Sequence, residues 1–137
     1  MKSLAMTMLC GCVLLVDGPA ASEAEPEVDC SKAETQMEMN ICAGKDYEEA
    51  DLALNIQWKL TKALMDRVDT ERQEKAGVSK LVASQRAWLA YRDAQCELDG
   101  HAMEGGSAQP LLVSSCLAEL TRKRTDELKS LNDAFGN

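Results

Sequence analysis

Hydrophobic side chains recur at intervals of three and four residues along most of this chain, the spacing that gathers them on one face of an α-helix. The longest series predicts a helix over residues 46–68, with acidic side chains in its first turn, where they complement the helix dipole. Its apolar stripe consists of Tyr47, Ala50, Leu54, Trp58, Thr61, Leu64, Met65 and Val68. Leu52, Ile56 and Leu60 lie off this stripe, so we expect the helix to be covered on two sides.

The same spacing predicts further helices over residues 34–43, 80–98 and 111–135. Residues that cap or break helices mark most of their ends, namely Ser31, Gly44, Ser79 and Gly136. The charged segment 69–77 ends in a glycine and is expected to be a turn or a frayed continuation of the preceding helix. Residues 99–110 contain three glycines and a proline and are expected to form the one long loop. No segment alternates as a strand would.

These elements predict an all-α fold, a small antiparallel bundle of three long helices plus a short N-terminal helix. Burial of the apolar stripes requires the long helices to pack against one another. We expect Trp58 and Trp88 in that core, because each lies on an otherwise apolar stripe. The alternative is that the two rings are platforms for carbohydrate.

The beginning of the chain has the layout of a secretory signal peptide. Lys2 precedes an apolar run over residues 4–16, and small residues follow up to Ala24. The run is too short to be a stable membrane span. We therefore expect residues 1–24 to be a signal peptide and residues 25–137 to be the mature helical domain. Leu9-Cys10-Gly11-Cys12 also resembles a lipid-attachment site, but the apolar run continues beyond it, whereas a lipid-anchored chain turns polar there.

Four cysteines follow this leader, and export to an oxidising compartment favours disulfides between them. They allow three pairings. We expect Cys30–Cys42 and Cys96–Cys116, since each pair encloses a short stretch that contains a turn. In the chain-entropy account each bridge stabilises the fold by roughly 3 kcal/mol. Zinc binding is the alternative, and it is disfavoured because the chain has no CxxC pair and a single histidine, His101.

The chain is acidic. Removing residues 1–24 takes away Lys2, Asp17 and Glu23, so the formal net charge of -8 becomes -7. This charge argues against binding to nucleic acid or to anionic membrane surfaces, and it favours cationic partners through faster encounter. The alternative is that the charge serves solubility alone.

Two arginines lie among hydrophobic positions and need polar or anionic partners. Arg92 shares a helical face with apolar residues, and Arg124 lies in the stripe of the last predicted helix. Asp51 and Asn55 are one helical turn apart and are suited to receive a guanidinium fork. An unpaired buried charge is very costly. We therefore interpret these residues and Gln85 as a hydrogen-bonded network that fixes helix register, with an anionic ligand site as the alternative.

Signals for catalysis are weak. Asp93 and Glu97 have the chemistry to flank a glycosidic bond, but such a pair on an acidic helical surface is usually solvated charge. The sequence has no HExxH, no GxSxG and no phosphate-binding glycine loop. His101 is the only candidate proton shuttle near neutral pH. We expect no enzymatic activity, no cofactor and no metal. The long loop is the better functional candidate, because recognition residues tend to lie on loops held by a rigid scaffold.

Several separated motifs occur in order along the predicted mature chain. They are Asp29-Cys30, Thr35-Gln36-Met37-Glu38-Met39-Asn40-Ile41-Cys42, Tyr47, Ala50-Asp51, Leu54-Asn55, Gln85-Arg86-Ala87-Trp88-Leu89, Tyr91-Arg92-Asp93-Ala94, Cys96, Glu104-Gly105-Gly106-Ser107, Cys116 and Arg124. Together they resemble the bacterial LprI-like lysozyme-inhibitor domain family, over about residues 29–128. The resemblance implies an all-helical, disulfide-bonded domain that is secreted or periplasmic. The family takes its name from members that inhibit lysozyme, the muramidase that cleaves peptidoglycan.

The resemblance leads to a specific hypothesis. The acidic domain would be drawn to a cationic lysozyme, and the loop would occlude its substrate cleft. The residues expected to make this contact are His101, Glu104, Gly105, Gly106 and Ser107. One rival hypothesis is an envelope scaffold or binding module that contacts peptidoglycan or a periplasmic protein without inhibiting anything. Another is a glycan-cleaving enzyme.

Overall fold

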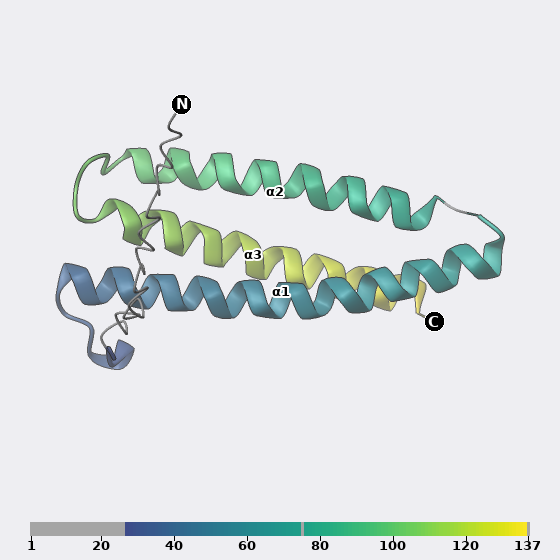
Figure 1. The fold of residues 1–137 in the computed structure, drawn as a ribbon, viewed down its shortest axis with the longest axis horizontal. Helices are drawn as coiled ribbons and strands as arrows, with labels where there is room; N and C mark the ends of the chain where they lie inside the picture. Colours follow the sequence, from purple (N-terminus) through teal and green to yellow (C-terminus); the bar gives the residue numbers. More distant parts are fainter. Residues whose placement is uncertain (1–26, 75, 137) are drawn as a thin grey trace, which may run out of the picture.

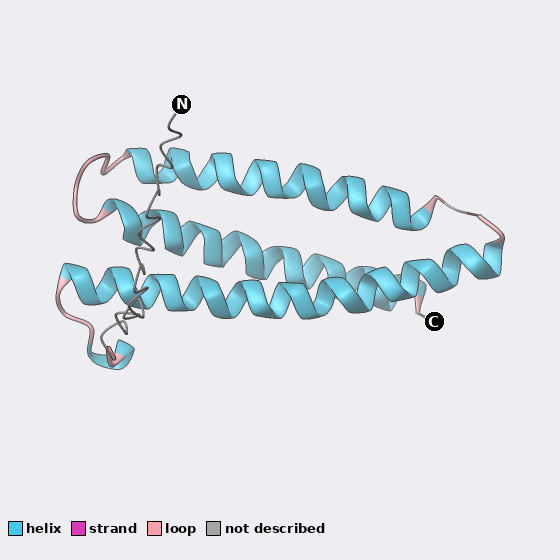
Figure 2. Cartoon of the chain, viewed as in Figure 1, coloured by secondary structure: helices cyan, strands magenta, loops and turns pink. Residues whose placement is uncertain are grey.

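The computed structural model describes residues 27–74 and 76–136. Within them the chain forms a short 3-10 helix and three long α-helices, with no strand (Figures 1 and 2). The order is η1 (Cys30–Lys32), α1 (Gln36–Arg72), α2 (Gly77–His101) and α3 (Gln109–Phe135). The long helices form an antiparallel bundle, which confirms the predicted fold class. The predicted signal peptide lies outside the described residues.

The first long helix, α1, is continuous over 37 residues, so the predicted break at Gly44 is wrong. A glycine costs a helix about 1 kcal/mol relative to alanine, which is little beside the packing of a long helix against its neighbours. The predicted short helix is therefore the first part of α1. Its cap is Thr35, whose hydroxyl accepts the N–H of Glu38 while the Glu38 carboxylate accepts the N–H of Thr35. The expected cap, Ser31, lies in η1 instead.

At its other end α1 continues to Arg72, into the segment predicted as a turn or a frayed continuation of this helix. Gln73 then adopts a left-handed conformation with φ 55°, the usual geometry of a residue that ends a helix. Its backbone N–H donates to the carbonyl of Thr70. The turn between α1 and α2 is consequently only four residues long, 73–76.

The start of α2 is capped by a side chain from α1 instead of by the predicted Ser79. The two carboxylate oxygens of Asp69 accept the backbone N–H groups of Gly77 and Val78, at 2.8 and 2.9 Å. A Cβ atom on Gly77 would lie 2.6 Å from Asp69 Oδ1, so this close approach requires a glycine. Ser79 donates its hydroxyl to the carbonyl of Ala76. The buried Asp69 carboxylate thus joins α1 to the start of α2 at this end of the bundle.

The predicted loop is shorter than expected because both flanking helices extend into it. Helix α2 continues to His101, and α3 begins at Gln109 with Pro110 in its first turn, where a missing N–H costs no helical bond. Gly105 has a φ of 72°, a conformation that suits glycine. At the far end α3 stops at Phe135 with Gly136 as its cap, as predicted.

Large buried hydrophobic residues gather in the half of the bundle near the 73–76 turn. Around them Trp58 and Trp88 are half-buried and pack against the cluster. The cluster consists of Leu54, Leu64, Met65, Val68, Leu81 and Leu128. On the opposite face of α1, however, Leu52, Ile56 and Leu60 are exposed, so within this chain the helix is covered on one side only. None of the helices in residues 27–74 and 76–136 is both long and apolar enough to cross a membrane.

The other half of the bundle buries small residues and carries both disulfides. The bonds Cys30–Cys42 and Cys96–Cys116 form the predicted pairs. The first ties η1 to α1, and the second ties the end of α2 to the beginning of α3. Figure 1 shows η1 and the α2–α3 connection at the same end of the molecule, opposite the 73–76 turn. The buried residues of this half are Ala43, Ala50, Cys96, Gly100 and Ala118.

Candidate functional site

The last residue of α2, His101, and the connection between α2 and α3, residues 102–108, are together called the tip loop. Its residues 101–107 are all exposed, although the backbone is well ordered by successive turns. Met103 and Glu104 donate their N–H groups to the carbonyls of Gly100 and His101, and Gly106 donates to Met103, at 2.9–3.2 Å. Just below it the Cys96–Cys116 bond joins the two helices that carry the loop. The tip loop is thus an exposed segment on a fixed base.

Side chains strengthen the tip loop further. His101 Nδ1 lies 2.6 Å from Glu104 Oε2. The Gly105 N–H donates to Gln109 Oε1 at 3.0 Å, and Asn40 Nδ2 on α1 donates to the carbonyl of Ser107 at 2.9 Å. The structure thus brings the five predicted loop residues together. It adds Asn40 and Gln109 as supports; Asn40 is 67 positions away from Ser107, so no local pattern in the sequence could have found it.

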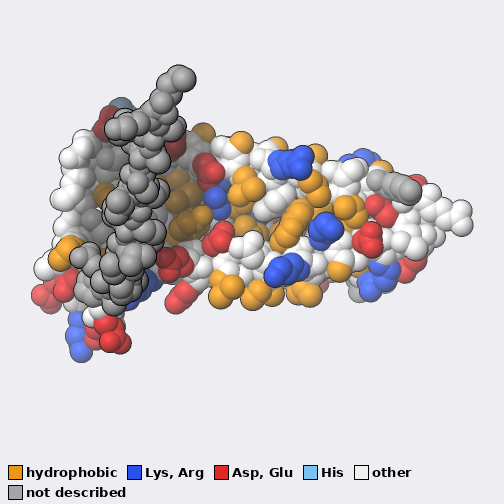
Figure 3. Space-filling view, in the orientation of Figure 1, with side chains coloured by type: hydrophobic (Ala, Val, Ile, Leu, Met, Phe, Trp, Pro, Cys, Tyr) orange, Lys and Arg blue, Asp and Glu red, His pale blue; other side chains and the backbone are white. Residues whose placement is uncertain are grey.

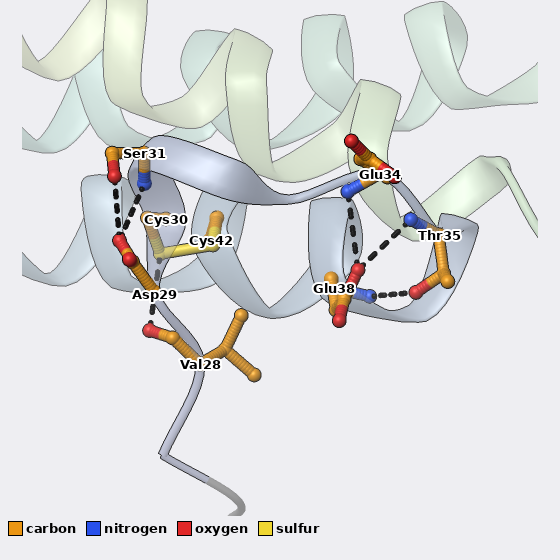
Figure 4. The surroundings of a disulfide bond; sticks show 8 residues. All are labelled: Val28, Asp29, Cys30, Ser31, Glu34, Thr35, Glu38 and Cys42. Atoms are coloured by element: carbon orange, nitrogen blue, oxygen red, sulfur yellow. Dashed lines mark hydrogen bonds between the residues drawn. A yellow bond between two sulfur atoms is a disulfide. The ribbon is translucent and has the colours of Figure 1, made fainter.

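The chain segment before α1 adds fixed negative charge near this end (Figure 4). Hydrogen bonds from the Ser31 hydroxyl, from Lys32 and from the Ser31 N–H lower the pKa of Asp29 below its usual value. The backbone N–H groups of Thr35 and Glu34 lower the pKa of Glu38 in the same way. Both carboxylates are ionised at neutral pH. Lys32, whose Nζ lies 3.1 Å from Asp29 Oδ2, offsets the charge of Asp29, so Glu38 is the one that adds negative charge to this end.

Arg92 occupies the centre of the bundle and is 6% exposed. Its main partner is the neighbouring Asp93, whose Oδ1 lies 2.9 Å from Nε and 2.8 Å from Nη2. The expected partner Asp51 is farther away, at 3.9 Å from Nη1, and accepts a 2.7 Å hydrogen bond from Asn55. The guanidinium also lies over the ring of Trp88, 5.0 Å from its centroid. Asp93, considered above as a catalytic carboxylate, is thus engaged with Arg92.

Arg124 is bound from three directions. It donates to Gln85 Oε1 and Ser84 Oγ on α2, both at 3.0 Å, and to Glu127 Oε2 at 2.7 Å. Its guanidinium lies 5.9 Å from the centroid of Trp88, so this ring is close to both arginines. Glu127 was missed in the sequence, although its position three residues after Arg124 on a helix is a signal for such a pair. With these partners the two arginines join α2 to α1 and α3.

A shallow groove runs between α1 and α2, and two partners of the buried arginines, Asp51 and Gln85, line it. It encloses about 280 Å³ and is lined by Asp51, Leu54, Asn55, Trp58, Val82, Gln85, Arg86 and Leu89. Because Arg92 and Arg124 already have carboxylate partners, the groove presents no unneutralised buried arginine to an anion. The arrangement favours a structural role for the two buried arginines. The groove itself is lined by one half-buried indole, by amide, carboxylate and apolar side chains and by the exposed Arg86.

The remaining catalytic candidates, Glu97 and His101, lie one helical turn apart on the exposed surface of α2. His101 pairs with Glu104 in the tip loop, and Glu97 is exposed on α2. Within residues 27–74 and 76–136, no group of three or more histidine, cysteine, aspartate or glutamate side chains is arranged to hold a metal ion. The tip loop and the groove are the two candidate binding surfaces among the described residues.

Comparison with known proteins assigns this architecture to a family. The family model described as lysozyme inhibitor LprI matches residues 29–128. The chain belongs to the LprI family. The matched region includes both disulfides, the groove and the tip loop of this LprI-family protein.

Similar proteins agree with this assignment. An uncharacterised protein of Rhizobium meliloti (strain 1021) is 47% identical over 130 residues, which cover 91% of this chain and 94% of the relative. The crystal structure of a DUF1311 family protein from Pseudomonas putida KT2440 superposes with a TM-score of 0.59 at 28% identity. That alignment covers 72% of this chain and 94% of the other. Membership of the LprI family rests on the match over residues 29–128, and the solved structure shows a similar fold.

Proposed function

We propose that this LprI-family protein is exported, binds lysozyme and inhibits it. The observation that carries the proposal is the family match over residues 29–128, which spans nearly the whole described domain. Two disulfides are consistent with an oxidising compartment such as the periplasm or the extracellular space. Residues 1–24 act as the signal peptide in this proposal.

The tip loop is the part that enters the lysozyme cleft. It is exposed, stands at one end of an elongated bundle and is held by the Cys96–Cys116 bond and by Asn40. A segment that is already ordered loses little conformational entropy on binding, which favours affinity. Met103 is 51% exposed and supplies an apolar contact, while His101 and Glu104 supply a donor and an acceptor. Glycosidases hold two carboxyl groups in the cleft, and a loop seated there excludes the substrate.

Charge brings the two proteins together. Removal of Lys2, Asp17 and Glu23 with residues 1–24 changes the formal net charge from -8 to -7, and the mature protein attracts a cationic lysozyme over a distance of about 10 Å at ~0.1 M salt. Asp29 and Glu38, which stay ionised, lie on the part of the molecule that carries the tip loop. Such attraction raises the association rate more than it slows dissociation. Inhibition at low protein concentration should therefore weaken as salt is added.

A turbidity assay on peptidoglycan with c-type, g-type and i-type lysozymes tests the proposal. We expect the mature protein to inhibit at least one type at micromolar concentration. No inhibition of any type would remove the proposed function. A variant with Met103→Asp and Glu104→Ala should lose inhibition, whereas Gln73→Ala with Glu74→Ala, at the opposite end, should retain it. If the wild type inhibits and both variants are equally active, the function stands and the assignment to the tip loop is wrong.

The groove supports a second candidate function, binding to the glycan strands of peptidoglycan without inhibition. Trp58 is half-buried there beside Asn55 and Gln85, and amide side chains next to an indole suit sugar hydroxyls and ring faces. Sedimentation with purified cell wall checks it: Asn55→Ala with Gln85→Ala should reduce binding while the tip-loop variant binds normally. If the wild type does not sediment with cell wall, this candidate fails.

A further inference from the structure

The hydrophobic cluster is open to solvent between the beginning of α2 and the end of α3. A cavity of about 290 Å³, called here the core cavity, lies there, and its apolar lining consists of Met65, Leu81, Leu131 and Phe135. Met65 and Leu81 belong to the cluster, and Leu131 packs against it. Phe135 is 38% exposed, and the guanidinium of Arg72 lies over its ring, 5.8 Å from the centroid. The core cavity is thus an opening into the core at the end of the bundle opposite the tip loop (Figure 1).

Two polar side chains of α2 lie at the rim of the core cavity. Lys80 and Ser84 are exposed and one helical turn apart, on the face of α2 that also carries Leu81. Lys80 forms no ion pair with another described residue. Ser84 Oγ accepts a hydrogen bond from Arg124 Nη2 at 3.0 Å, and its own O–H donates to no described acceptor. The rim therefore offers an unpaired ammonium group and a hydroxyl proton.

The acidic side chains near the core cavity are engaged or face elsewhere. Asp69 accepts two backbone N–H groups at the start of α2, and Glu127 pairs with Arg124. Asp133 lies two positions before Phe135, and therefore on the opposite side of α3. Two further carboxylates of this end line a separate hollow between α1 and α2, those of Asp66 and Glu74. The rim of the core cavity is consequently suited to an anion.

We infer that the core cavity binds a fatty acid with a chain of about eight carbons. At ~30 Å³ per heavy atom, the volume of a water molecule in the liquid, the cavity has room for roughly ten heavy atoms. The chain removes the apolar lining from water, which is favourable. The two carboxylate oxygens accept hydrogen bonds from the Lys80 ammonium group and the Ser84 hydroxyl.

The scarcity of hydrogen-bond acceptors in the core cavity selects this class of ligand. A peptide or a sugar brings N–H or O–H donors, which are costly to bury without acceptors. Among the described side chains of the lining, Ser84 Oγ is the only oxygen atom, and it is already bonded to Arg124. A ligand whose sole polar group is a carboxylate leaves no donor unsatisfied. The groove between α1 and α2, where hydrophobic side chains also reach the surface (Figure 3), differs because amides and carboxylates line it.

Titration of the mature, oxidised protein with octanoate tests the inference, with amide chemical shifts measured by NMR. Shifts at the beginning of α2 and the end of α3 should saturate with a dissociation constant of roughly 0.1 to 1 mM, as expected for a ligand of this size. Octylammonium has the same chain with a positive head, and it should bind at least about tenfold more weakly because it would face Lys80. Acetate, which has the head without the chain, should cause no saturable shift.

A substitution at the rim separates the carboxylate contact from apolar binding. Lys80→Gln should weaken octanoate binding about fivefold and leave the binding of octanol unchanged. Lys62→Gln is the matched control, because Lys62 is exposed on α1 outside the core cavity and loses the same charge. It should bind octanoate as the wild type does.

Three results would overturn the inference. The first is octanoate binding that does not saturate up to about 5 mM, well above the expected dissociation constant. The second is equal binding of octanoate and octylammonium, or an affinity for octanoate that Lys80→Gln leaves unchanged. The third is tighter binding of an acetylated leucine dipeptide than of octanoate, which would assign the core cavity to peptide chains. None of these measurements involves lysozyme, so this inference and the proposed function can fail separately.

Discussion

The two ends of the bundle are held together by different means. Near the 73–76 turn, large side chains from all three helices form a hydrophobic cluster, and Asp69 joins α1 to α2. Around the tip loop the buried residues are mainly alanines, a glycine and a cysteine, which remove little apolar surface from water. Covalent bonds supply the missing cohesion there. The end that presents the exposed loop is thus the one that depends on oxidation.

Among the substitutions that test the difference between the two ends, Leu128→Ala is expected to lower the free energy of unfolding most. Leu128 is 0% exposed within the cluster, and truncation of a buried leucine costs about 3 to 4 kcal/mol through lost burial and the cavity that remains. Urea unfolding should show this loss of stability. Hydrogen exchange should show reduced protection near the 73–76 turn before any change at the tip loop. Leu98→Ala, at an exposed position, is the control and should change stability little.

Removal of the Cys96–Cys116 bond by Cys96→Ala with Cys116→Ala should cost about 3 kcal/mol. In this variant hydrogen exchange should become faster at the tip loop and stay unchanged in the hydrophobic cluster. Leu128→Ala should have the opposite distribution. The bond Cys30–Cys42 is the informative control, since η1 buries no residue and the three helices can persist without it. Its removal should release η1 locally and lower global stability by about 1 kcal/mol or less. Equal losses for the two bonds would show that η1 is part of the cooperative unit.

Asp69→Ala should cost about 1 to 2 kcal/mol, the usual range for a lost helix cap. It leaves the backbone N–H groups of Gly77 and Val78 without their carboxylate partner. Asp66→Ala, one turn earlier and exposed, is the control. Thermal unfolding measures both variants. If Asp69→Ala matches its control, the cap is dispensable and the cluster alone holds that end of the bundle.

Local signals in the sequence predicted much of this architecture. Apolar spacing indicated the long helices, short loop closure indicated both disulfide pairs, and glycine content indicated the tip loop. The errors arose where a distant contact outweighs a local preference. The penalty of about 1 kcal/mol for Gly44 does not break a helix packed along its length. Asp69 caps a helix eight residues later through the fold of the turn. Arg92 forms its shortest ion pair with the neighbouring Asp93 instead of with Asp51. No local pattern indicated that Leu52, Ile56 and Leu60 would be exposed to solvent.

The smallest change in stability is expected from a substitution in the capping box at the start of α1, which consists of Thr35 and Glu38. Because folding lowers the pKa of Glu38 below its usual value of 4.5, the carboxylate stabilises the folded state when ionised. This contribution is complete above the unfolded pKa and disappears as the pH falls through the lower, folded pKa. Glu38→Gln should therefore reduce stability near neutral pH and have progressively less effect in acid, as measured by urea unfolding across that range.

Glu48→Gln, an exposed change farther along the same helix, is the control for this pH dependence. It should show no such convergence with the wild type in acid. If the Glu38 variant loses stability by the same amount at every pH, the carboxylate acts through geometry instead of charge. If it loses more when the Cys30–Cys42 bond is absent, the cap and the bond support the same segment. In that case cohesion at the tip-loop end is shared between a covalent bond and an ionised side chain, unlike the apolar cohesion at the opposite end.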